Sequence, residues 1–114
     1  MLFQLKWSPS ALQVRNSLRA AADKATQSRR RRGKTKSSKA EGLYKQVAKC
    51  LARLATNPRH PGLHTHVFHT MPHPTDPNGK VFVAYAQNNT PGAWRVLWCY
   101  GPGERDITVL VIEA

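Results

Sequence analysis

The chain has 114 residues, and its 18 Lys and Arg against 6 Asp and Glu give a formal net charge of +12. This length suits one domain with one modest core. No apolar run approaches the roughly twenty residues of a membrane-spanning helix. The apolar run at the start of the chain is too short for a signal peptide. We therefore expect a single cytoplasmic domain over residues 1–114, with no membrane partner and a preference for acidic partners.

The start of the chain is predicted to form a strand followed by a helix. Residues 2–7 alternate between two sets of side chains, with the period of a strand that buries one face. Ser8 has the side chain of a helix N-cap, and Pro9 suits a first helical turn. Apolar residues then recur at helical spacing, so we expect this helix to run to about Arg30.

A basic segment at residues 29–39, with the sequence RRRRGKTKSSK, follows the first helix. It contains no acidic residue, and basic residues on the flanking helices extend its positive charge. The segment has three interpretations: a solvated link, a binding site for nucleic acid phosphates, or a docking surface for an acidic protein segment. As a phosphate-binding site it would use Arg29, Arg30, Arg31, Arg32, Lys34, Lys36 and Lys39.

The second helix is predicted to begin near Lys39 or Ala40 and to end at Asn57-Pro58. From Leu43 onward, apolar residues recur at i, i+4, i+7, i+8 and i+11, which places them on one stripe. Two consecutive amphipathic helices form a helical hairpin that has to pack its stripe on another apolar surface.

The rest of the chain supplies that surface as strands. We expect a short strand within Gly62–His69, then apolar strands at Val81–Gln87, Ala93–Tyr100 and Ile107–Ile112. A hairpin turn is predicted at residues 88–92. The order predicts an α+β domain in which an N-terminal strand and a two-helix hairpin pack on a mostly antiparallel sheet of four to five strands.

Three stretches of the chain carry a family resemblance. LKWSPSALQVRNSL has a strand followed by a serine and a proline at a helix start, LARLATNPRHPGLHTH has a helix that ends in Asn-Pro, and KVFVAYAQNNTPGAWRVLWCY has a hairpin with an arginine in its second strand. In this order they resemble the RelE/ParE superfamily of toxins from bacterial type II toxin–antitoxin modules. The resemblance covers most of the chain outside the basic segment.

The resemblance implies a RelE/ParE-like fold and a toxin that a cognate antitoxin, through an acidic segment, holds inactive. RelE-like proteins cleave mRNA in the ribosomal A site, whereas ParE-like proteins poison DNA gyrase. Arg95 matches the strand arginine that the ribonuclease branch uses on the scissile phosphate. The strand at residues 81–87 lacks the charged side chains that ribonuclease members have there, which favours the alternative of a binding protein without catalysis.

Five histidines lie between residues 60 and 73, and histidine is suited to proton transfer near neutral pH. Metal-independent transesterification of RNA needs a base, an acid and a cation for the phosphorane. On a strand, His64 and His66 would project to one face. We therefore predict a catalytic group of His64, His66, Tyr85 and Arg95. The alternatives are surface histidines without a role and a structural ion pair of Arg95 with Glu104, Asp106 or Glu113.

We expect no metal and no cofactor. His64 and His66 have the alternation of a metal-binding strand, but Asp76 is the nearest acidic residue in sequence and no Cys lies close. Together with these residues, the resemblance implies a toxin-like protein that binds RNA or the ribosome and cleaves mRNA. The alternative is a non-catalytic relative on the same fold: a gyrase inhibitor, a nucleic acid binder or an inactive protein.

Overall fold

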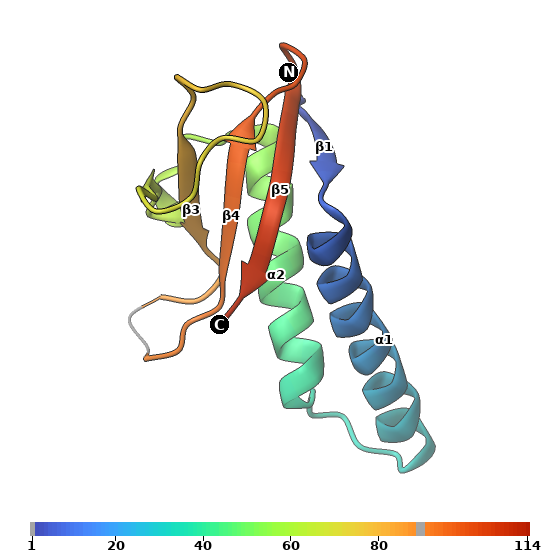
Figure 1. The fold of residues 1–114 in the computed structure, drawn as a ribbon. Coiled ribbons are helices and arrows are strands. Elements are labelled where there is room, and N and C mark those ends of the chain that lie inside the picture. The colour runs from blue at the N-terminus through green and yellow to red at the C-terminus, as the bar shows by residue number, and fades with distance from the viewer. Residues whose placement is uncertain (1, 89–90) are drawn as a thin grey trace.

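Residues 2–88 and 91–114, which the computed structural model describes, form two α-helices and a sheet of five strands (Figure 1). This confirms the predicted α+β class, with its N-terminal strand, its helical hairpin and its mostly antiparallel sheet. The elements are β1 (Gln4–Trp7), α1 (Pro9–Arg31), α2 (Lys39–Thr56), a 3-10 turn (Pro61–Leu63), β2 (His66–Val67), β3 (Val81–Tyr85), β4 (Arg95–Tyr100) and β5 (Asp106–Glu113).

The strand order across the sheet is β1-β5-β4-β3-β2. The first and last strands of the chain pair in parallel, with Leu5 opposite Ile107, while the other pairs are antiparallel. Parallel pairing requires a long connection between the strands, and here the helical hairpin and all other strands lie between them in sequence. Residues 89 and 90 of the predicted turn at 88–92 lie outside the described residues.

Ser8 begins α1 as predicted and also fastens it to the sheet. Its hydroxyl accepts a hydrogen bond from the Ala11 amide at 3.1 Å and donates one to the Leu110 carbonyl at 2.6 Å. Pro9 occupies the first turn, where its missing N–H costs nothing. The start of α1 is therefore held by β5, the strand that pairs with β1.

Glu41 joins the end of α1 to the start of α2. Its carboxylate accepts from the Ser38 amide at 2.7 Å, and Ser38 in turn caps the helix, which makes a capping box. The same carboxylate accepts from the Thr26 hydroxyl at 2.5 Å and pairs with the Arg29 guanidinium at 3.0 Å. The bonds from Arg29, then from Ser38 and Thr26, lower the pKa of Glu41 to about 2.

The main core lies between the helical hairpin and one face of the sheet. The α2 stripe contributes Val47, Cys50, Leu51 and Leu54, all of them buried as the periodicity predicted, and burial raises the pKa of the Cys50 thiol to about 12. A smaller cluster occupies the other face, because side chains alternate along strands. Its buried members are Val81, Val83, Leu97 and Cys99, against which Phe68 and Met71 pack.

Only part of the predicted strand at Gly62–His69 forms. Pro61 starts a 3-10 turn, which His60 caps by accepting the Gly62 amide on Nδ1 at 2.9 Å. His64 ends this turn with a positive φ of 49°, so the strand is limited to His66–Val67. The prediction that His64 and His66 share one strand face was therefore wrong, because local turn chemistry overrides the alternation of the sequence.

Candidate functional site

A row of polar side chains crosses the sheet on the face opposite the helices. Tyr85 on β3 is the register partner of Arg95 on β4, and Arg95 is the partner of Glu113 on β5. His66 on β2 pairs with Val83, so it lies on the same face as Tyr85. Cross-strand partners are direct neighbours, and we call these four residues the Arg95 face.

Arg95 is held by one carboxylate and one aromatic ring. Its Nε and Nη2 donate to the same Glu113 oxygen at 2.9 and 2.5 Å, and its Cζ lies 5.3 Å from the Phe68 ring centroid. Among the described residues Nη1 makes no hydrogen bond, and the side chain stays 30% exposed. The structural ion pair considered for Arg95 thus exists, with Glu113 as the acid, and within the part of the chain that the structure describes it leaves Nη1 free.

Two proton-transfer groups lie beside each other on this face. The His66 ring is 5.7 Å from the Tyr85 ring, centroid to centroid, with the planes tilted by 33°. The Nδ1 of His66 lies 3.4 Å from the His64 carbonyl oxygen. Three of the four predicted catalytic residues, Arg95, Tyr85 and His66, are therefore brought onto one face.

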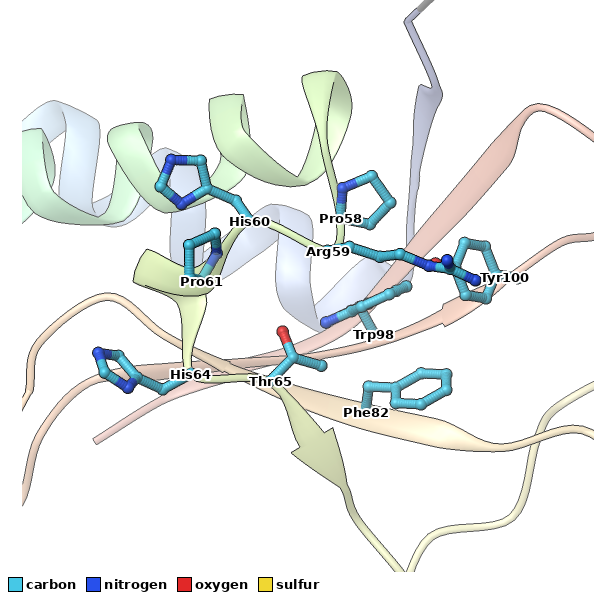
Figure 2. A pocket seen from close by; sticks show the side chains of 9 residues that line it. All are labelled: Pro58, Arg59, His60, Pro61, His64, Thr65, Phe82, Trp98 and Tyr100. Atoms are coloured by element: carbon cyan, nitrogen blue, oxygen red, sulfur yellow. The ribbon is translucent and has the colours of Figure 1, made fainter.

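His64 lies elsewhere. It is exposed at the end of the 3-10 turn and lines a pocket with Phe82, Trp98 and Tyr100 (Figure 2). Those aromatic residues alternate with the members of the smaller cluster along β3 and β4, so the pocket opens on the helix side of the sheet. The fourth member of the Arg95 face is Glu113, and the register of β4 with β5 selects it from the three acids that were considered as partners of Arg95.

Two other histidines have structural roles. His60 caps the 3-10 turn as described above. The Nδ1 of His73 accepts from the amides of Thr75 and Asp76 at 3.2 and 3.0 Å. Its Nε2 must then carry the proton, which it donates to the Tyr100 carbonyl at 2.8 Å. This imidazole therefore fastens the proline-rich loop to the end of β4.

Within residues 2–88 and 91–114, no three His, Cys, Asp or Glu side chains gather in a way that could hold a metal ion.

In the same residues, neither helix is both long and apolar enough to cross a bilayer. The Arg95 face itself offers a cation, a phenol, an imidazole and a carboxylate.

The basic segment lies at the tip of the helical hairpin, which projects past the sheet (Figure 1). Arg29 is half-buried in its ion pair with Glu41, so it serves the hairpin itself. The other six predicted phosphate-binding residues have exposed side chains at this tip: Arg30, Arg31, Arg32, Lys34, Lys36 and Lys39.

Comparison of the chain with protein-family models gave no match, and searches of curated proteins and of solved structures gave none either.

Proposed function

We propose that this chain is a cytoplasmic, toxin-like protein of the RelE/ParE type that binds RNA, or the ribosome, and cleaves mRNA without a metal. The observation that carries the proposal is the convergence of Arg95, Tyr85 and His66 on the Arg95 face. The element order and the basic hairpin tip agree with it. A cognate antitoxin with an acidic segment would hold such a protein inactive, by covering either the tip or this face.

The side chains of the Arg95 face match the demands of RNA transesterification. One of His66 and Tyr85 takes the proton of the 2′-hydroxyl, the 2′-oxygen attacks phosphorus, and the bond to the 5′-oxygen breaks as the other group protonates it. Arg95 offers Nη1 to the non-bridging oxygens, whose negative charge grows in the transition state. The products are a 2′,3′-cyclic phosphate and a 5′-hydroxyl, so no metal or cofactor enters the balance.

A second candidate function is binding without cleavage. The ion pair with Glu113 favours it, because a carboxylate already takes up two donor atoms of Arg95 and offsets its charge. Such a protein would inhibit DNA gyrase or bind nucleic acid through the hairpin tip, and an inactive relative is the limiting case.

Induced expression in a bacterium, with growth followed and mRNA ends mapped, tests the proposal. The wild-type chain should arrest growth and create new ends in translated messages, and Arg95→Ala should abolish both. Arg105→Ala is the matched control, since Arg105 also stacks on an aromatic ring, Phe3, at 5.2 Å but lies away from the Arg95 face.

The remaining outcomes distinguish the candidates. Arrest with intact mRNA would overturn the ribonuclease proposal and favour gyrase. Folded protein that causes no arrest would overturn the toxin proposal itself. Equal toxicity of the Arg95→Ala variant and the wild type would remove Arg95 from the reaction.

A further inference from the structure

A pocket of about 520 Å³ lies between the connection from α2 to β2 and the helix side of the sheet (Figure 2). It is separate from the Arg95 face, because its strand residues point to the opposite side of the sheet. The lining residues that matter for its chemistry are Arg59, Thr65, Phe82, Trp98 and Tyr100.

One wall of the pocket is a cluster of aromatic rings. Phe82 and Trp98 stack with centroids 5.0 Å apart, and Tyr100 meets Trp98 edge-on at 5.0 Å. Rings in contact with each other form a rigid surface on which a flat ligand can stack. Tyr100 is 40% exposed, so this surface is open to solvent at its outer end.

Trp98 also brings an unused hydrogen-bond donor to this place. The residue is 1% exposed, and its Nε1 is buried without any hydrogen-bond partner in the described residues. In Figure 2 the indole nitrogen points toward the wall made by Pro61 and Thr65. An indole N–H can only donate, and a buried donor left unpaired is rare in folded proteins, so an acceptor on a ligand would complete it.

The guanidinium of Arg59 lies at the opening of the same pocket. Arg59 is exposed, and its side chain extends toward the Tyr100 ring in Figure 2. The two ion pairs found in the described residues are Arg29–Glu41 and Arg95–Glu113, so its charge is not taken up by a neighbouring acid. Guanidinium groups bind phosphate through two parallel hydrogen bonds.

We propose that this pocket binds a nucleotide. The base lies against the aromatic wall, one of its carbonyl or ring-nitrogen acceptors bonds the Trp98 Nε1–H, and the phosphate is bound by Arg59. An acidic peptide would match the cation alone, whereas a nucleotide matches the ring surface, the single buried donor and the cation together. The proposed function supplies the source, an unpaired base of a bound RNA strand, but the pocket can be tested without RNA.

Titration of 15N-labelled full-length protein with adenosine and uridine monophosphates, followed by NMR of the indole N–H signals, tests the inference. The Trp98 signal, assigned as the one missing from Trp98→Phe, should shift saturably. Loss of one hydrogen bond predicts about fivefold weaker binding of the nucleotides by Trp98→Phe. Arg59→Ala should weaken binding of the monophosphates by about tenfold and leave binding of the unphosphorylated nucleosides unchanged.

Trp94→Phe and Arg15→Ala are the matched controls and should bind as the wild type does. If Trp98→Phe does not fold, the Arg59→Ala variant alone tests the pocket, because Arg59 is exposed and its replacement should leave the fold intact. The absence of a saturable shift up to about 10 mM nucleotide, or the same shift with inorganic phosphate alone, would overturn the inference. Undiminished binding by both variants would overturn it as well.

The failure of this inference and the failure of the proposed function are distinguishable. Arg95→Ala, which removes the proposed cleavage site, should leave the shift of the Trp98 indole signal by monophosphates as it is in the wild type, because Arg95 does not line the pocket. If the protein binds nucleotides but causes no growth arrest, the pocket proposal holds and the toxin proposal is overturned. Growth arrest with mRNA cleavage by a protein that binds no monophosphate would do the reverse.

Discussion

At the scale of single residues, the pairing of Arg95 with Glu113 decides how much positive potential the Arg95 face offers. The carboxylate binds one edge of the guanidinium, and the face of Phe68 supports the group from its flat side. Both charged side chains are about a third exposed, 30% and 38%, so water screens their attraction. The pair therefore orients Arg95 more than it stabilises the fold.

Replacing Glu113 with Gln should show whether Arg95 mainly binds RNA or mainly stabilises the fold through its ion pair. Removal of the carboxylate should tighten binding of a short single-stranded RNA by about threefold, since a unit charge near a surface phosphate repels it by under 1 kcal/mol in screened water. The free energy of unfolding should fall by less than about 1 kcal/mol. Fluorescence anisotropy and urea denaturation measure the two quantities.

Glu104→Gln is the control for this experiment, because it removes the same charge from an exposed turn. A loss of about 2 kcal/mol or more in Glu113→Gln, with RNA affinity unchanged, would show instead that the pair is structural.

At the scale of elements, Glu41 fixes the geometry of the hairpin. One carboxylate receives bonds from the last turns of α1 and from the start of α2. The hairpin tip, with its exposed cations, is thereby held on two rigid helix ends. This arrangement also explains why Arg29 differs from the other residues of the basic segment.

The stability that Glu41 contributes should depend on pH with a definite sign. Its pKa is about 2 in the folded chain and 4.5 as the ordinary value, so the charged form favours folding. The contribution is complete above about 4.5 and is lost as the pH falls toward 2. The urea midpoints of wild type and Glu41→Gln should thus differ by a constant amount from pH 5.5 to 7.5 and converge near pH 2.

Glu104→Gln again serves as the control and should show no such convergence. A difference between wild type and Glu41→Gln that persists unchanged at pH 2 would mean that the carboxylate does not act through its charge.

The α2 stripe should carry much of the attachment of the hairpin to the sheet. Leu54 is 0% exposed in the main core, so Leu54→Ala should lower the free energy of unfolding by about 2–5 kcal/mol. Leu12 on α1 is 39% exposed, and Leu12→Ala should change it by no more than about 0.5 kcal/mol. Equal effects in chemical denaturation would show that α2 does not pack as described.

At the scale of the whole molecule, the net charge is +12 because only 6 Asp and Glu oppose 18 Lys and Arg. The molecule is elongated and measures 53 by 27 by 26 Å. The hairpin tip and the Arg95 face lie toward the same end, because β4 begins and β5 ends on the side of the sheet nearer the tip (Figure 1). In the proposed function, a single RNA strand bound at the Arg95 face would therefore extend toward the exposed cations.

The salt dependence of RNA binding should report the contribution of the tip. Single-stranded nucleic acid gives a slope of log K against log salt of about −0.7 for each phosphate neutralised. Replacing Lys34, Lys36 and Lys39 with Ala should therefore reduce the slope by about 2 if each contacts a phosphate. Replacing Arg15, Arg19 and Lys24 on α1 removes the same charge elsewhere, and an equal reduction there would indicate a diffuse field.

Much of the architecture was predictable because it depends on local interactions. Ser8 and Pro9 begin α1, the stripe from Leu43 defines α2, and Asn57 ends it, as the sequence predicted. The prediction of a strand within Gly62–His69 was only partly right, because the strand is limited to His66–Val67. There His60 and Pro61 build a turn, and only the placement of that turn against the sheet showed that His64 lines a pocket and not the Arg95 face.

The sequence by itself determined the two helices, the apolar strands and the basic segment, since periodicity, caps and charge act between near neighbours. Only the tertiary structure decided that β1 pairs in parallel with β5 and that Glu113 is the acid beside Arg95. It also showed that, within the described residues, the buried Nε1–H of Trp98 has no hydrogen-bond partner at the edge of a pocket. These features arise from contacts between segments far apart in the chain, where sheet register sets which side chains meet.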